Sequence, residues 1–260
     1  MAQKPKRDMD IAEAANSLKT LFITQNLSLV AMLHPGAPIL EWHRELTGAP
    51  RDADIPVDLM KRDTDEGVRF SALQAFEYVR ELPSADVQKD LLAGPMLLGA
   101  TKIGNLLIRH DLNRSERPLT QFARHFRNAA AHGDSWYFKG EEPKSPAYTR
   151  DVCLDQSLDG SRATFETVGP YEYVMFLDEI AAFAKQVTLE KAIKLVYQRR
   201  DGKNPAEIHV SLQQELESRG FKCSDQSVQW HIAQYTAQVY NGKLPEVNVA
   251  PQSYPLENSN

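Results

Sequence analysis

Apolar residues near the start of the chain recur every three or four positions, which is the spacing of one face of an α-helix. They are Ile11, Ala15, Leu18 and Phe22. The pattern predicts a long amphipathic helix from residue 8 to the segment His34-Pro35-Gly36, where proline and glycine interrupt helical geometry. Residues 35–65 hold several prolines and glycines, and they predict a loop with one short helix at 39–46.

The helical spacing returns through most of the remaining chain. The expected helices cover 66–81, a segment starting at Ser84, a segment from Pro95 past Leu107, and then 118–132, 170–198, 205–218 and 224–240. Proline is tolerated at the first position of a helix, so Pro118 marks a helix start. Gly133 favours the left-handed conformation that ends a helix. Short alternating runs around Asp159-Gly160 predict a tight β-hairpin.

These elements together predict an all-α protein that carries one small β-hairpin and a C-terminal helical module. The expected bundle covers residues 1–200, with the hairpin at about 150–168. A small module of two helices is expected over 205–240, followed by a flexible tail over 241–260.

Composition and charge narrow the classes of function. The 260 residues are 42% hydrophobic and 25% charged, which is ordinary for a globular protein. The net charge is −5, so any contact with nucleic acid has to come from a local basic surface. Cys153 and Cys223 are far apart and lack disulfide or zinc spacing. The sequence has no signal-peptide segment and no run near the roughly 18 apolar residues of a spanning helix, so we expect a soluble cytoplasmic protein. We also expect that the protein uses no metal and no cofactor.

One predicted helix combines packing residues with many polar ones, in the stretch QFARHFRNAAAHGD at 121–134. Arg127 and His132 stand five positions apart, while Asn128 and His132 stand four apart and therefore share a helix face. The three alanines between them keep the surface low, which lets a large ligand approach.

These residue types suit the cleavage of RNA. An arginine fork binds two phosphate oxygens, a histidine transfers a proton to or from a ribose hydroxyl, and an asparagine orients either group. The 2′-hydroxyl of RNA supplies the nucleophile, so the reaction needs no metal. The alternative is that these residues have no function in catalysis. Positive side chains at the C-terminal end of a helix stabilise it by interacting with the helix dipole. Because acid–base catalysis uses two proton carriers, we expect two protomers to share the site across a two-fold axis.

The hexapeptide from Arg127 to His132, at the end of a helix in a largely helical chain, resembles the R-polar-x(3–5)-H signature of the HEPN superfamily. Members are helical bundles that commonly dimerise. Many are metal-independent endoribonucleases of toxin–antitoxin, abortive-infection or CRISPR-type defence systems, and some are inert binding modules. The resemblance is sharp over 121–138, and the hairpin is extra to the minimal bundle. It implies Arg127 and His132 as catalytic residues, Asn128 as their polar partner, RNA as substrate, a homodimer, and an antitoxin or defence-system partner.

A wider basic surface is expected around this motif. Between Arg109 and His132 five arginines stand against two acidic residues, Asp111 and Glu116. The further candidates for RNA binding are Arg109, Arg114, Arg124, His125 and Trp136. Trp136 or its neighbour Tyr137 is a candidate for stacking on a base. Packing of the aromatic residues and ordinary surface polarity of the charged ones are the alternatives.

The C-terminal module supports a second hypothesis from another class. Its apolar positions around Gly220 resemble a helix-turn-helix, and Ser224 is a candidate cap for a recognition helix. The second helix has no lysine or arginine, which disfavours DNA binding. The alternative function is therefore a non-catalytic dimeric regulator or adaptor that binds DNA or protein through this module.

Overall fold

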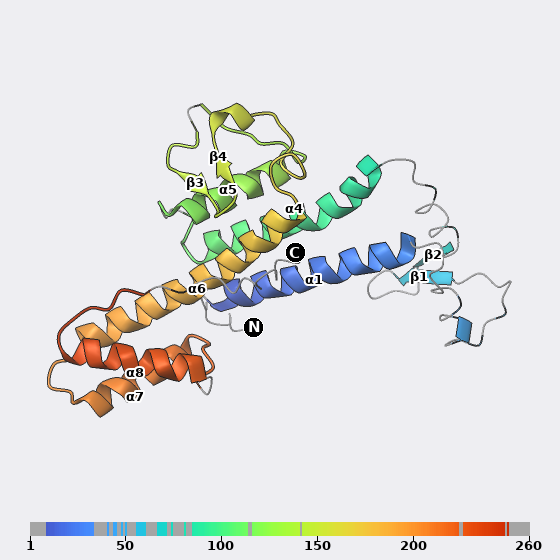
Figure 1. Cartoon of the computed structure of the whole chain (residues 1–260). Helices are drawn as coiled ribbons and strands as arrows, with labels where there is room; N and C mark the ends of the chain where they lie inside the picture. The colour runs from blue at the N-terminus through green and yellow to red at the C-terminus, as the bar shows by residue number, and fades with distance from the viewer. Residues whose placement is uncertain are drawn as a thin grey trace, which may run out of the picture. The chain divides into compact units, whose positions relative to one another are not determined.

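The computed structural model shows a mostly helical chain, and Figure 1 labels its elements. The structure describes residues 9–33, 41, 44–45, 48, 50, 56–60, 67–71, 74, 81, 85–113, 116–140, 142–223, 226–247 and 249. The chain divides into two compact units, one of residues 1–20 and 95–260 and the other of residues 21–94. The all-α class expected from the sequence is confirmed. Most of the predicted 39–46 helix and of the tail beyond 247 lies outside the described residues.

Five of the predicted helices are confirmed with nearly the expected bounds. They are α1 (Met9–Leu33), α5 (Pro118–Ala131), α6 (Pro170–Gln198), α7 (Pro205–Ser218) and α8 (Gln226–Tyr240). Three of them begin with proline at the first helical position, where its missing N–H costs nothing. Asn204 caps α7, because its side-chain oxygen accepts from the Glu207 N–H at 3.0 Å and its own N–H donates to the Glu207 carboxylate at 2.8 Å.

The two helices predicted on either side of Pro95 form one helix, α4 (Ala85–Arg109). Proline inside a helix removes a backbone hydrogen bond and costs about 3 kcal/mol. The buried positions nevertheless keep helical spacing through Pro95, in the order Ala93, Met96, Ala100, Ile103 and Leu107. The prediction of a break was wrong because this continuous buried face outweighs the local cost.

The described residues form two short hairpins, and neither is the one that the sequence predicts. In the unit of residues 21–94, β1 (Pro56–Met60) pairs antiparallel with β2 (Gly67–Ser71), with Leu59 opposite Val68. The first strand falls in the predicted loop, and the second replaces the start of the helix predicted at 66–81. Val68 and Phe70 alternate with polar or small residues, which is strand periodicity.

The second hairpin pairs β3 (Ala147–Tyr148) with β4 (Cys153–Leu154). Asp159-Gly160, expected at a hairpin turn, instead follows a 3₁₀ turn called η1 (Gln156–Leu158), and Gly160 has a positive φ of 80°. The segment after it returns to the end of α5, where Ser135 bridges to Arg162. The dipeptide does form a turn, but its flanking residues pair elsewhere.

Aromatic rings form the centre of the unit of residues 1–20 and 95–260. Phe122 and Phe126 of α5 lie 5.4 and 5.9 Å, between ring centroids, from Phe176 of α6. Trp136, just beyond α5, lies 6.2 and 5.8 Å from the same two rings. All four side chains are at most 1% exposed. This tilted packing of rings fixes α5 against α6.

A second cluster of buried residues joins the end of α6 to α7 and α8. It contains Ala192, Ile193 and Val196 of α6, Leu212 and Leu216 of α7, and Ile232 and Val239 of α8, among others. The C-terminal helices therefore share a core with α6. This contact explains why the long α6 helix continues past the aromatic centre.

One described helical segment, Lys89–Arg109 in α4, is long and apolar enough to span a membrane by length and composition alone. From the sequence we expect no segment of this length and apolar character. The buried core helix of a soluble protein meets the same criterion. Met96, Ile103 and Leu107 of this segment are at most 1% exposed and pack inside the protein, whereas Leu91, Leu98 and Ile108 are exposed.

We predict that Gly99→Ala lowers the free energy of unfolding by about 1–3 kcal/mol, the usual range for overpacking a core. A Cβ at Gly99 would overlap the Tyr173 hydroxyl and lie 2.9 Å from its Cζ. Gly94→Ala is the matched control, because a Cβ there meets nothing within 4 Å beyond its chain neighbours. It should change the free energy of unfolding less than Gly99→Ala does, because the gain from replacing a helical glycine is offset by the contact of its Cβ with Pro95, the next residue. Urea unfolding of both variants measures the difference, and equal effects would contradict the packing described for Tyr173.

Candidate functional site

Helix α5 positions the motif residues, and both of its ends match the sequence prediction. It begins after Arg117, whose extended backbone leads into Pro118. His132 is the C-terminal cap residue, and Gly133 follows with a positive φ of 71°. Between these ends, Phe122, Phe126 and Ala129 face the core.

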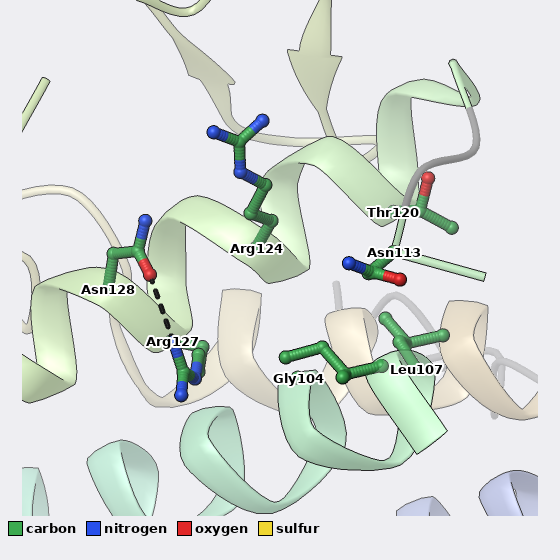
Figure 2. A pocket seen from close by; sticks show the side chains of 8 residues that line it. Gly104, Leu107, Asn113, Thr120, Arg124, Arg127 and Asn128 are labelled. Atoms are coloured by element: carbon green, nitrogen blue, oxygen red, sulfur yellow. Dashed lines mark hydrogen bonds between the residues drawn. The ribbon is translucent and has the colours of Figure 1, made fainter. Parts of the chain in front are cut away.

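The Arg127 side chain is half-buried and lies between α5 and α4 (Figure 2). Its Nε donates to the Asn105 side-chain oxygen at 3.3 Å, and its Nη1 donates to the Asn128 side-chain oxygen at 3.4 Å. Both partners are neutral amides. Within the part of the chain that the structure describes, Arg127 forms no ion pair with a carboxylate. Its positive charge is therefore held in place and remains available to an anion.

Gly104 of α4 allows Arg127 to occupy this position. A Cβ at Gly104 would stand 2.6 Å from Cβ and 2.7 Å from Cγ of Arg127. Those distances are far inside van der Waals contact, so any other residue would push the arginine or the helix away. The missing side chain thus sets the distance between α4 and α5 at the motif.

A pocket of about 200 Å³ opens between α4 and α5. One wall comes from α4 and the other from α5, and Asn113 from the loop between them closes one end (Figure 2). The lining residues are Gly104, Leu107, Ile108, Asn113, Thr120, Arg124, Arg127 and Asn128. The pocket thus combines an apolar wall with two guanidinium groups and two amides.

His132 does not line this pocket. Five residues along an α-helix turn the chain by about 500°, so Arg127 and His132 point roughly 140° apart. His132 is exposed, and its ring lies 4.3 Å from the ring of Tyr137, which is 47% exposed. Within one chain the structure therefore brings Arg127 and Asn128 together and leaves the imidazole on the neighbouring surface.

Asp134 is a residue near the site that the sequence analysis missed. Its carboxylate accepts from Arg162 Nε at 2.8 Å, from the Thr164 N–H at 2.9 Å and from the Thr164 hydroxyl at 2.5 Å. These bonds fasten the 162–164 segment to the end of α5 and so fix the chain between His132 and Tyr137. An aspartate after the glycine that ends a helix is a signal for a turn, but its partners 28 and 30 residues later are not readable from spacing.

The remaining predicted RNA-binding residues differ in where they lie and in how exposed they are. Arg124 lines the pocket and forms an ion pair of 2.7 Å with Glu142. Arg109 is exposed in the last turn of α4, and Arg114 lies outside the described residues. His125 is 2% exposed and Trp136 is 1% exposed.

Burial therefore corrects the predictions for Trp136 and His125, which we assign to packing. The Trp136 indole N–H donates a hydrogen bond to the Thr167 hydroxyl at 2.9 Å. Its ring is buried, so no face is open for stacking on a base. The His125 ring packs edge-on against Phe138, with centroids 5.3 Å apart. Tyr137 is the exposed aromatic residue of this segment.

The described residues contain no group of three or more histidine, cysteine, aspartate or glutamate side chains arranged to hold a metal ion. The candidate site offers guanidinium, amide, imidazole and phenol groups, from Arg127, Asn128, His132 and Tyr137. Burial lowers the pKa of His125, with a smaller opposing contribution from Glu142 and a further lowering from Arg124. Its Nδ1 has no hydrogen-bond partner among the described residues.

We predict that His125 makes stability fall in acid. The unfolded chain takes up the proton at the ordinary pKa of 6.5, while the folded chain resists it, so protonation favours unfolding. The free energy of unfolding should decline as the pH drops below 6.5, by at most about 1.4 kcal/mol per pH unit from this group. His125→Phe should flatten that slope between pH 7.5 and 5, and His209→Ala should leave it unchanged. A His125→Phe slope equal to that of the wild type would contradict a neutral buried imidazole.

Comparison with known proteins adds nothing to these geometric findings. No protein-family model matches the chain, and no curated protein or solved structure matches it either. The HEPN resemblance therefore rests on the motif at 127–132 and on the helical class. What the site does has to be argued from its side chains.

Proposed function

We propose that the protein is a metal-independent endoribonuclease of HEPN type, in a toxin or phage-defence setting. One observation carries the proposal: α5 presents Arg127, whose partners among the described residues are amides, beside a pocket, and the helix ends at the exposed His132. A structural arginine at a helix surface usually pairs with a carboxylate, as Arg117 does with Glu190 at 2.8 Å. A guanidinium held by two amides is suited to an external anion.

The reaction follows from these groups. The ribose 2′-oxygen attacks the adjacent phosphorus, a new O–P bond forms, and the bond from phosphorus to the 5′-oxygen breaks. Arg127 binds the non-bridging oxygens and stabilises their developing charge. A base accepts the proton of the 2′-hydroxyl, and an acid protonates the leaving 5′-oxygen. His132 serves in one of these proton transfers, and Asn128 holds the arginine through the 3.4 Å hydrogen bond.

A homodimer supplies what one chain lacks. Arg127 and His132 point to different sides of α5 in one chain, and each chain has one motif histidine. A two-fold axis beside α5 brings two copies of both residues to one seam. The same seam provides two imidazoles, one for each proton transfer.

The non-catalytic regulator or adaptor is the alternative. The observation in its favour is Trp230 on α8, which is 62% exposed, whereas Ile232, Tyr235 and Val239 of the same helix are buried in the cluster shared with α6 and α7. An exposed tryptophan is typical of protein–protein contact. This alternative predicts that removing the chain after residue 204 abolishes function and that Arg127 and His132 variants behave as the wild type does.

We predict that His132→Ala lowers the rate of RNA cleavage by about 10²–10⁴-fold, the usual contribution of general acid–base catalysis. Purified protein is incubated with a labelled structured RNA in EDTA, and 2′,3′-cyclic phosphate ends are scored. His209→Ala, a histidine variant on α7, is the matched control and should cleave at the wild-type rate. Arg127→Lys keeps the charge but loses the fork, and it should also reduce cleavage. Equal activity of the wild type and His132→Ala would remove His132 from the mechanism.

We predict further that two inactive variants complement each other. A mixed dimer of Arg127→Ala and His132→Ala chains retains one arginine and one histidine at the seam. Cleavage should therefore return in part when the two are mixed and allowed to exchange, at a rate below that of the wild type because one of the two imidazoles is missing. Each variant alone is the control. If the mixture stays inactive although size-exclusion chromatography shows mixed dimers, the site lies within one chain. A wild-type monomer at the assay concentration would contradict the seam outright.

A further inference from the structure

The pocket between α4 and α5 has a composition that phosphate binding alone does not require. Phosphate sites need positive charge and N–H donors, which Arg127 supplies, while Arg124 on the same wall is paired with Glu142. Ile108, 44% exposed at the surface of α4, adds an apolar wall, and Leu107, 1% exposed, lies at the base of the pocket. The apolar wall and the amides together require a ligand with flat apolar faces and polar edges.

We propose that this pocket binds one nucleobase of the RNA, next to the phosphate that is cleaved, and thereby sets the base preference of the enzyme. This inference rests on the proposed function. It names the part of the substrate that the pocket recognises, a single unpaired base, and the residues that recognise it: Asn113, Asn128, Leu107 and Ile108.

The volume of the pocket limits the ligand to one ring system. Sites for whole small molecules measure about 300–1,000 Å³. At about 200 Å³ the pocket is too small for a complete nucleotide. A base inserted alone leaves its ribose and phosphate outside, near Arg127, whose side chain reaches from α5 towards α4 (Figure 2).

The amide groups are free to contact the edge of a base. The Asn113 side chain makes no hydrogen bond to any part of the chain that the structure describes, and it closes one end of the pocket. Asn128 accepts from Arg127 through its oxygen, and its NH₂ group makes no bond to a described residue. Asparagine amides carry both donors and acceptors, which is the pattern that discriminates between bases.

The positive charge favours RNA over an apolar protein side chain as the occupant. An inserted leucine or phenylalanine would contact Leu107 and Ile108, but it would offer no partner to the Asn113 amide or the Asn128 NH₂ group and no negative charge to Arg127. A nucleotide satisfies the apolar wall with its ring, the amides with its edge, and Arg127 with its phosphate.

The test measures the binding of four short single-stranded RNAs, each a tetramer of one base, to the full-length protein. Methylation of every 2′-oxygen prevents cleavage, so binding is measured apart from chemistry. We expect the wild type to bind one tetramer roughly fivefold or more tighter than the weakest, which is the lower end for one well-formed contact to a base. Asn113→Asp replaces the amide donors with an acceptor, and the preferred base should change.

Ile108→Trp fills the pocket from its mouth and should abolish the preference while the arginines still bind the strand weakly. Leu98→Trp is the matched control, because Leu98 is 61% exposed on the same helix and does not line the pocket. It should keep the wild-type preference. Equal affinity of the wild type for all four tetramers, or a preference unchanged in Ile108→Trp, would overturn the inference.

The two proposals fail separately in this design. If unmethylated RNA is cleaved in EDTA without any base preference in binding or cleavage, the ribonuclease stands and the pocket inference is wrong. If one tetramer is preferred through the pocket but no RNA is cleaved, the pocket binds a base in a protein that is no ribonuclease. Absence of any RNA binding would overturn both.

Discussion

The close approach of α4 and α5 at Gly104 is the constraint on which the site depends. Because no Cβ occupies that position, the aliphatic part of Arg127 lies across the α4 backbone. The guanidinium then meets Asn105 and Asn128 instead of a carboxylate. The same approach leaves the small pocket beside it, with apolar residues from α4 facing charged and amide residues from α5. One missing side chain thus determines both where the charge lies and how much space surrounds it.

The aromatic core and Asp134 hold the other half of the candidate site. Phe122, Phe126, Trp136 and Phe176 fix α5 and the segment that follows it. Asp134 then joins that segment to residues 162–164. His132 and Tyr137 are exposed on top of this rigid support. Trp136 is buried and Tyr137 is exposed, so Tyr137 is the aromatic residue of this pair that can contact a ligand.

The sequence predicted those features that depend on neighbouring residues. Pro118 and Gly133 set the ends of α5, and Pro205 sets the start of α7, because each acts on its own turn of the chain. The predictions failed where distant residues decide. The two-residue strands of the second hairpin and the continuous helix through Pro95 depend on packing that local propensity does not contain.

In the candidate site, too, the features set by neighbouring residues could be predicted and those set by distant residues could not. The Arg127–His132 motif is readable from its spacing, and so is the position of His132 at a helix end. The part played by Gly104 is not, because its partner lies 23 residues later and a glycine in a helix has several explanations. The burial of His125 and Trp136 was missed for a related reason. Both residues lie next to the motif, and from the sequence we therefore interpret them as RNA-binding residues. Their exposure depends instead on packing against α6 and the 135–168 segment, which the local sequence does not reveal.

The most direct measurement compares the RNA affinity of Gly104→Ala with that of Gly99→Ala. Both substitutions insert a methyl group into a tight contact of α4, but only the first displaces Arg127, since the second meets Tyr173. Affinity for a short uncleavable RNA is measured at a temperature where circular dichroism shows both variants folded. The account predicts weaker binding by Gly104→Ala alone. Wild-type affinity in both variants, or an equal loss in both, would contradict the claim that Gly104 holds Arg127 in place for an anionic ligand.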